Sequence, residues 1–268
     1  MRQWNAILVG SALLLLMGVV YADVSLVDPV VAKARPNGII DAGSISPGDT
    51  AELIFSRISG YGKTAFWNQA ILTLNGNGTG IRTTNSKEGT DSLITSIRTT
   101  TAKQEGTYTF NVTLKGDGET LLDEHVSLTL NIQKGLMKAS LSAESVEGRV
   151  NEPLLYYVLL VNDSSATVPV FIEPMLPQSW TEGKTITLKP HSFESIPLII
   201  TPRFAGPKGF EINVIRADNG ITIRKLDATL VANPTLKDRY SAGLYGFPFF
   251  TISLVSHYLA NAFFSFLL

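Results

Sequence analysis

The chain has 268 residues, of which 44% are hydrophobic and 17% are charged, with a formal net charge of −1. This composition excludes a disordered chain, and the balanced charge without a Lys/Arg cluster excludes an electrostatic surface for nucleic acid. The sequence contains no cysteine, which excludes disulfides, thiolate zinc sites and cysteine nucleophiles.

The N-terminal residues 1–22 have the layout of a secretory signal peptide. A basic residue comes first, an apolar run follows, and the small residues Val20 and Ala22 precede a cleavage site after Ala22. An uncleaved membrane anchor is the alternative, but the apolar run is shorter than the ~20 residues that a span requires. We therefore expect an exported chain, and a cysteine-free exported chain favours a prokaryotic surface.

The middle of the chain predicts strands. Short runs of alternating apolar and polar residues are separated by Gly, Pro, Asn and Asp, which is typical of β-sandwiches. The alternation places one face of each strand on a core and the other in water. The runs are TAELIFSRI (50–58), GTYTFNVTLKG (106–116), HVSLTLNIQ (125–133), LLYYVLLVN (154–162), KTITLKP (184–190), FEINVIRA (210–217) and ITIRKLDATLVA (221–232).

The sequence repeats itself with an offset of 103 positions, the difference between 209 and 106. This offset aligns 106–112 with 209–214, and it also aligns 51–55 with 154–158. A period of about a hundred residues is the usual size of an immunoglobulin-like sandwich, so the repeat predicts two such domains. One large barrel is the alternative, and it would make the repeated strand order a coincidence.

The predicted fold class is therefore all-β, with two tandem immunoglobulin-like β-sandwiches at residues 23–134 and 139–233. The linker is expected near Lys134–Ala139, where the sequence QKGLMKAS interrupts the alternation.

The second repeat resembles the NEW3 family of immunoglobulin-like domains over residues 145–232. The residues that carry the resemblance are a strand that ends in Asn, the segment Leu176-Pro177-x-x-Trp180, the turn Leu188-x-Pro190 and a Gly-aromatic pair before a final hairpin. His191 stands where the family usually has Gly. Such domains are found beside glycosidase catalytic domains and in tandem on archaeal and bacterial envelope proteins. The resemblance therefore implies an envelope protein. The first repeat lacks the Leu-Pro-x-x-Trp segment.

Two tryptophans could either fill a core or form a platform for sugars. Trp180 follows a proline turn, and Trp67 lies in a predicted strand. A lone Trp in an alternating strand usually faces inward, so we expect both to lie in cores.

Two segments contain the Gly-Lys-Thr triplet of phosphate-binding loops, SGYGKT (59–64) and TEGKT (181–185). Such a loop needs another Gly five positions before the Gly of the triplet. Arg57 and Gln178 stand at these positions. We therefore expect no nucleotide.

Other catalytic and metal-binding patterns are also missing from the sequence. The three histidines, His125, His191 and His257, are far apart, and neither a Gly-x-Ser-x-Gly segment nor a paired His motif occurs. The sequence therefore predicts a protein that is not an enzyme and that has no cofactor or metal.

Three Asn-x-Ser/Thr triplets, at Asn77, Asn111 and Asn162, are candidate glycosylation sites. A glycan requires a side chain that faces water, and Asn77, in a Gly-Asn turn, is the best candidate. Chance occurrence is the alternative for all three.

The C-terminal residues 243–268 contain no charged residue, so we expect a transmembrane helix at 246–268 with the β domains outside the cell. Removal of the tail in exchange for a lipid anchor is the alternative, but the polar spacer of such signals is missing. Within the tail, four polar residues at intervals of four form one stripe on the predicted helix. They form either an interface with another helix or a tolerated set without a partner: Ser253, His257, Asn261 and Ser265.

Taken together, the sequence predicts a membrane-anchored surface protein with a structural or adhesive role. Its expected partners are the membrane and either a protein or a surface glycan. An accessory subunit of a membrane complex and a glycan-recognition module are the alternatives.

Overall fold

The structure is a computed structural model that describes residues 23–58, 66–76, 78–84, 86–116, 121–235 and 252–267. The expected signal peptide lies outside the described residues. The chain divides into two compact units between Lys134 and Gly135. We call them unit 1 and unit 2 and describe each by itself.

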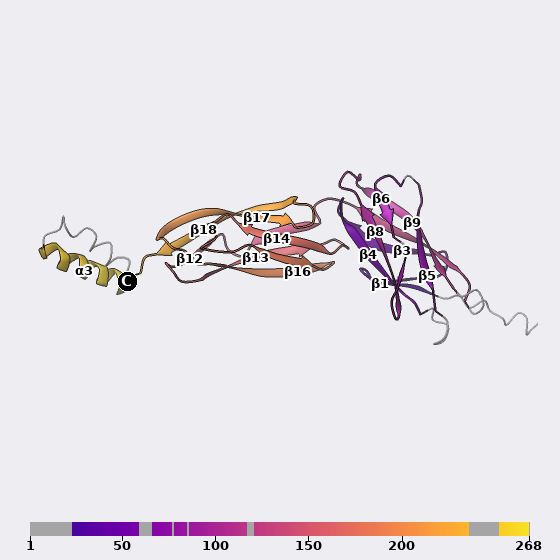
Figure 1. Cartoon of the computed structure of the whole chain (residues 1–268), viewed down its shortest axis with the longest axis horizontal. Coiled ribbons are helices and arrows are strands. Elements are labelled where there is room, and N and C mark those ends of the chain that lie inside the picture. The colour runs from indigo at the N-terminus through magenta and orange to yellow at the C-terminus, as the bar shows by residue number, and fades with distance from the viewer. Residues whose placement is uncertain are drawn as a thin grey trace, which may run out of the picture. The chain divides into compact units, whose positions relative to one another are not determined.

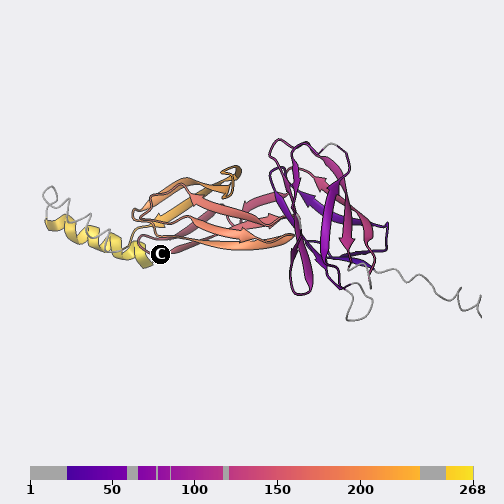
Figure 2. The same ribbon diagram turned by 45° about the vertical axis from the view of Figure 1, so that its right-hand side comes forward.

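Unit 1 consists of two β-sheets that form two layers (Figure 1, Figure 2). One sheet has the strand order β2-β1-β4-β8-β6, with β7 also paired to β8, and the other has the order β3-β10-β9-β5. The strands are β1 (Val24–Asp28), β2 (Ala32–Ala34), β3 (Ile39–Ile45), β4 (Thr50–Ser56), β5 (Gln69–Leu74), β6 (Ile81–Thr83), β7 (Lys87–Glu88), β8 (Ser92–Thr99), β9 (Gly106–Lys115) and β10 (Glu124–Ile132).

Unit 2 is also built from two sheets, one of three strands and one of five. Their orders are β11-β13-β16 and β12-β18-β17-β14-β15. The strands are β11 (Met137–Leu141), β12 (Ser145–Arg149), β13 (Leu154–Asn162), β14 (Val168–Pro174), β15 (Lys184–Leu188), β16 (Ser192–Ile200), β17 (Gly206–Arg216) and β18 (Thr222–Asn233).

The two units share one strand order. The neighbours β1-β4-β8 and β3-β10-β9-β5 of unit 1 correspond to β11-β13-β16 and β12-β18-β17-β14 of unit 2. Each unit also has a parallel pair at the equivalent place, β3 with β10 and β12 with β18. This division of the strands between two sheets is that of an immunoglobulin-like sandwich. The segments that the 103-residue offset aligns belong to equivalent strands, β4 with β13 and β9 with β17.

Each unit has its own hydrophobic core, because alternate residues of its strands face inward. In unit 2 the inward residues of both sheets form one cluster that includes Tyr156 and Trp180. Trp67 of unit 1 is 0% exposed, and Trp180 is 7% exposed. The prediction that both tryptophans fill cores is therefore confirmed, and neither presents a ring face as a sugar platform.

The first strand of unit 2 begins inside the segment that the sequence analysis assigns to the linker. β11 starts at Met137 and pairs antiparallel with β13. Its residues Met137, Ala139 and Leu141 are partly buried and pack against the core of unit 2. The alternation of this strand is hard to recognise in the sequence, because only two polar residues, Lys138 and Ser140, alternate with its apolar residues.

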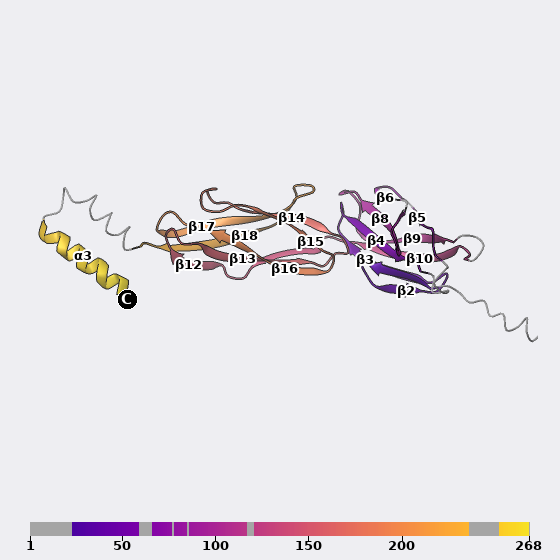
Figure 3. The ribbon, with the colours of Figure 1, turned by 60° about the horizontal axis from the view of Figure 1, so that its bottom comes forward.

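The tail contains one described helix, α3 (Ile252–Leu267), which is the yellow helix in Figure 3. It covers 16 residues, whereas the sequence predicts a span over residues 246–268. No helix among the described residues is both long and apolar enough to cross a membrane.

Candidate interaction surface

The three-stranded sheet of unit 2 carries apolar side chains on its outer side as well as on its inner side. In β13, Leu154, Tyr156, Val158 and Leu160 are buried in the core. The residues between them point outward, and they are also apolar, as are most outward residues of β16. We call this surface the apolar face, and it consists of Leu155, Tyr157, Leu159 and Val161 from β13 with Phe193, Pro197 and Ile199 from β16.

Four of these side chains are strongly exposed: Leu155 by 47%, Tyr157 by 41%, Phe193 by 60% and Ile199 by 58%. The exposed residues of the two strands lie directly opposite each other, since β13 and β16 pair antiparallel with Leu155 opposite Ile199, Tyr157 opposite Pro197 and Val161 opposite Phe193. Directly opposite side chains lie about 5 Å apart, so the apolar face is continuous rather than a set of scattered residues.

Polar residues border the apolar face along β11. Lys138 and Ser140 point to the same side as the face and are exposed. The Lys138 ammonium lies 2.6 Å from a carboxylate oxygen of Asp163. An apolar centre with a polar rim is the usual arrangement of a protein interface.

The edge of this sheet is open at β16. No strand of the described residues pairs with the far side of β16. Pro197 lies within this edge strand and has no N–H to donate, which disfavours the addition of a further strand. A partner is therefore expected to contact the face of the sheet and not its edge.

An open groove of about 480 Å³ adjoins the apolar face. Pro197 and Ile199 of the face form one wall, and the segment from Gln178 to Lys184 forms the other. The groove therefore combines apolar side chains with an amide, a carboxylate and an ammonium group.

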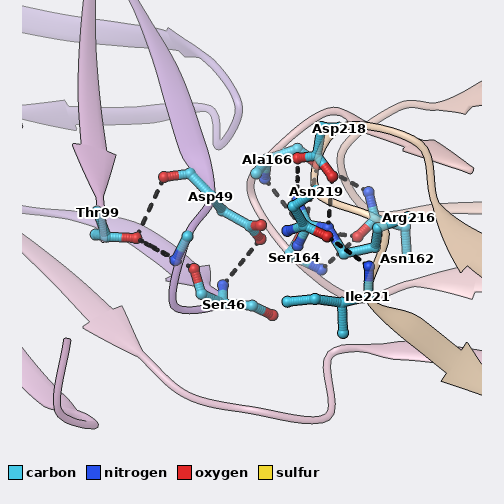
Figure 4. A network of polar contacts seen from close by, with 11 residues as sticks. Ser46, Asp49, Thr99, Asn162, Ser164, Ala166, Arg216, Asp218, Asn219 and Ile221 are labelled. Carbon is cyan, nitrogen blue, oxygen red and sulfur yellow. Dashed lines mark hydrogen bonds and ion pairs between the residues drawn. The ribbon is translucent and has the colours of Figure 1, made fainter. Parts of the chain in front are cut away.

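The candidate glycosylation site Asn162 is a buried structural residue. Its side chain is 0% exposed, and its amide nitrogen donates hydrogen bonds to the backbone oxygens of Ala166 and Lys189, both at 2.8 Å. Its side-chain oxygen accepts hydrogen bonds from the N–H and hydroxyl of Ser164 (Figure 4). Asn162 thus holds the loop after β13 against the turn before β16. A glycan would require this nitrogen to be free, so the expectation at Asn162 is wrong for the folded domain.

The other two candidate glycosylation sites are not buried residues of the described structure. Asn111 lies in β9 with its side chain exposed, and its side-chain oxygen accepts a hydrogen bond of 2.8 Å from Asn75. This hydrogen bond uses the side-chain oxygen of Asn111 and not its amide nitrogen, which is the atom to which a glycan would be attached. The side chain of Asn111 is exposed. Asn77 lies outside the described residues.

The polar stripe of the tail lies on α3. His257 and Asn261 are exposed, and their side chains approach each other to 3.4 Å. The Ser265 hydroxyl donates to the backbone oxygen of Ala262 at 3.2 Å. Ser253 is the fourth member and lies one residue after the start of the helix. His257, Asn261 and Ser265 therefore have polar contacts within α3 itself, without a second helix.

The remaining sequence motifs have structural roles. His191 has a φ of 49°, in the left-handed region that favours glycine, which explains why Gly is usual at this turn. TEGKT (181–185) begins in the connection after β14 and ends in β15, so it does not open a helix. SGYGKT (59–64) lies outside the described residues.

The described titratable groups do not form a metal-binding cluster. No three His, Asp or Glu side chains in the described part of the chain are placed to hold a metal ion. Burial raises the pKa of the Tyr156 hydroxyl, and this hydroxyl donates to the backbone oxygen of Thr229 inside the core.

No protein-family model matches the sequence, and no curated protein matches it. The chain is similar in structure to a chimeric titin Z1Z2 carrying a peptide from decorin, at 11% identity with a TM-score of 0.38, covering 81% of this chain and 99% of that one. It is also similar to fibronectin(III)-like modules of Clostridium thermocellum CbhA, at 11% identity with a TM-score of 0.29, covering 79% and 94%. A third similar structure is the C-terminal domain of the Streptococcus agalactiae AgI/II polypeptide BspA, at 9% identity with a TM-score of 0.30, covering 78% and 99%. None of these three TM-scores exceeds 0.38, so the likenesses carry no argument about function.

The apolar face is not among the features predicted from the sequence, although a signal for it exists. LLYYVLLV in β13 is apolar at every position, and PLII in β16 is too. A strand with one face in water is expected to alternate, whereas an unbroken apolar run indicates that both faces are buried. The outer positions of these runs mark the surface.

Proposed function

We propose that this chain is a non-enzymatic, exported protein anchored in the cell membrane, whose two β-sandwiches act in structural or adhesive interactions outside the cell. The observation that carries the proposal is the apolar face of unit 2. Four of its side chains are between 41% and 60% exposed, and they belong to two neighbouring strands. Continuous exposed apolar surface of this kind marks a site of contact with another macromolecule.

The export and anchoring parts of the proposal rest on the ends of the chain. Residues 1–22 have the layout of a signal peptide, and residues 243–268 contain no charged residue. In α3, the side chains of Tyr258, Phe263 and Phe264 are at least 53% exposed. Such a surface is costly in water and favourable in lipid, which supports a membrane role for the tail.

The kinship with NEW3-type domains of prokaryotic envelope proteins belongs to the same proposal. It is supported by the buried Trp180 after the Leu-Pro segment and by the positive φ of His191 at a turn where these domains usually have Gly.

Flotation and surface proteolysis test the anchoring. The full chain is produced in a bacterial host and compared with a chain that ends at Thr235. We expect the full chain to float with membrane vesicles and to be cut by protease added outside, and the shorter chain to remain in the soluble fraction. If both chains remain soluble, or if protease cuts neither in intact cells, the proposal is wrong.

An accessory subunit of a membrane complex is the second candidate, because the apolar face fits a different protein as well. Crosslinking in whole cells separates the two. A discrete particle in which peptides of β13 and β16 are joined to another membrane protein favours the subunit.

A glycan-recognition module is supported only by the groove beside the face, where Gln178, Glu182 and Lys184 offer polar groups. Binding to a glycan array that is lost on Glu182→Ala and Lys184→Ala would favour this candidate over contact through the apolar face.

A further inference from the structure

The apolar face has the properties of a surface that packs against a flat partner. Its seven side chains lie on two adjacent, paired strands, so they form a sheet face without a deep pocket of their own. Two sheet faces pack about 10 Å apart with their strands roughly aligned, as the two sheets of each unit already do in their cores.

The residue types of the outer side match those of the inner side. The inward residues of β13 are Leu154, Tyr156, Val158 and Leu160, and the outward residues are again three aliphatic residues and one Tyr. A surface with the composition of a sandwich core is complementary to a second surface of the same composition.

The charges of the sheet also permit such a pairing. On β13 and β16 the outward positions 155, 157, 159, 161, 193, 195, 197 and 199 contain no charged residue. The Lys138 ammonium in β11 is paired with Asp163 of the same unit, and the Glu182 and Lys184 side chains lie at the border of the face, in the groove beside Pro197 and Ile199. Two copies can therefore bring this face together across a twofold axis without placing like charges in contact.

The size of the face determines how strong that contact is. Strands about 4.8 Å apart and residues about 3.3 Å apart give the two nine-residue strands β13 and β16 a footprint of about 300 Å². Stable interfaces bury about 800 Å² on each partner, so the face alone supports weak association that needs a high local concentration. Tethering to a membrane supplies such a concentration.

We propose that the apolar face of unit 2 binds the apolar face of a second copy of this chain, so that the tethered protein associates in pairs through the sheet β11-β13-β16. The inference rests on the proposed function, because the tether raises the local concentration. It adds the identity of the partner, and it assigns the interaction to β13 and β16.

The absence of cysteine makes a direct test available. Leu159→Cys places a single thiol at the centre of the face, where it lies near its copy in a symmetric pair. Thr73→Cys is the matched control, since Thr73 is an exposed outward residue of β5 in unit 1. The full chain carrying either change is reconstituted in lipid vesicles at the same density and treated with a thiol crosslinker about 8 Å long, which suits facing sheets.

We expect L159C to give about tenfold more crosslinked dimer than T73C. The reason is that pairing through the apolar face brings position 159 of the two copies close together and does not do so for position 73. Adding L155E and I199S to L159C should reduce the dimer to the level of T73C. Adding I39S and L122E instead should leave the dimer unchanged, since Ile39 and Leu122 are exposed apolar residues of unit 1, at 70% and 76%, and do not belong to the face. Equal yields from L159C and T73C overturn the proposal and leave the face to a different protein or to lipid.

Flotation of the same vesicles separates a failure of the tether from a failure of the pairing. If the chain does not float, the same comparison is made in solution at about 1 mM chain, the range of local concentration that a tether provides. An excess of dimer from L159C over T73C in solution supports pairing through the apolar face even though the anchoring fails. The absence of such an excess overturns the pairing.

Discussion

The two units share a strand order but differ in what the equivalent sheets show to the outside. In β4 and β8 of unit 1 the outward residues are mixed, with charged and hydroxyl side chains beside two Ile, whereas β13 and β16 of unit 2 are nearly all apolar there. The offset of 103 residues that aligns β4 with β13 also aligns β8 with β16. The corresponding outward positions are Glu52 and Leu155, Ile54 and Tyr157, Ser56 and Leu159, and Ser96 and Ile199.

The edges of these two sheets differ as well. In unit 1 the outer edge of β8 is covered by β6 and β7, while β16 of unit 2 has no further strand partner among the described residues and contains Pro197. The inward residues therefore determine the sandwich in both units. The outward residues are then free to give one unit a mixed, largely polar sheet surface and the other an exposed apolar face.

The largest predicted effect tests whether each unit is held by its own core. Tyr156 of β13 is 1% exposed, and Leu53, its equivalent in β4, is 0% exposed. Tyr156→Ala should lower the free energy of unfolding of unit 2 by about 3–5 kcal/mol and leave unit 1 unchanged, since the cavity lies in one core only. Native-state hydrogen exchange, read from β17–β18 and β9–β10 peptides separately, measures both units. Leu53→Ala is the mirror-image control, and a loss shared equally by both units would show that they unfold together.

The next largest effect concerns a buried polar residue of unit 2, Asn162, in comparison with an exposed one of unit 1. Asn162→Ala should destabilise unit 2 by about 2–4 kcal/mol, because several buried backbone and hydroxyl groups lose their partners. The exposed Asn111 of unit 1 is the control, and Asn111→Ala should change stability by less than about 0.5 kcal/mol. Urea denaturation gives both values, and mass analysis of the exported chain should find no glycan on Asn162. A glycan there in folded protein contradicts the buried network.

The hydroxyl of Tyr156 distinguishes the two units in alkaline solution. Burial raises the pKa of this hydroxyl above its usual value near 10, so the folded unit keeps the proton more firmly than the unfolded chain does. The resulting stability is fully present below about pH 10 and is lost as the pH rises through the raised pKa. Tyr156→Phe should cost about 1–2 kcal/mol at pH 8 through the lost hydrogen bond and should remove that part of the alkaline decline. Urea midpoints between pH 8 and 11 test this, and parallel curves for both proteins would contradict it.

The smallest predicted effect concerns the apolar face itself. Leu155→Glu with Ile199→Ser gives unit 2 the residue pair that unit 1 has at Glu52 and Ser96, which are likewise opposite each other. We expect the unfolding free energy of isolated chains to change by less than about 0.5 kcal/mol, because both side chains are largely exposed. A thermal unfolding curve in dilute solution checks this, and a loss as large as that of Tyr156→Ala would mean that the face supports the fold.

Much of the fold follows from the sequence because inward positions alternate. The runs at 50–58, 106–116 and 154–162 correspond to β4, β9 and β13, and the repeat offset aligns equivalent strands. β11 escapes prediction because five residues are too few for a clear alternation. The turn at His191 carries a positive φ on a residue other than Gly, so its conformation is set by the hydrogen bonds around it.

The candidate site is less predictable, because an Asn triplet does not reveal burial. Asn162 satisfies the triplet, but tertiary contacts with Ala166 and Lys189 bury it. The apolar face is visible in the sequence only as the unbroken run in β13. Such a run also occurs in strands buried on both sides, so the register and exposure of β13 and β16 were needed to show that one side is open.

Radical footprinting of the intact chain on membranes tests most directly whether another molecule covers the apolar face. We expect Tyr157 and Phe193 to be labelled much less on densely loaded vesicles than in dilute detergent, while Phe66, an exposed aromatic residue of unit 1, is labelled equally in both. If Tyr157 and Phe193 are labelled equally in both conditions, the face remains open to water and is not an interaction surface.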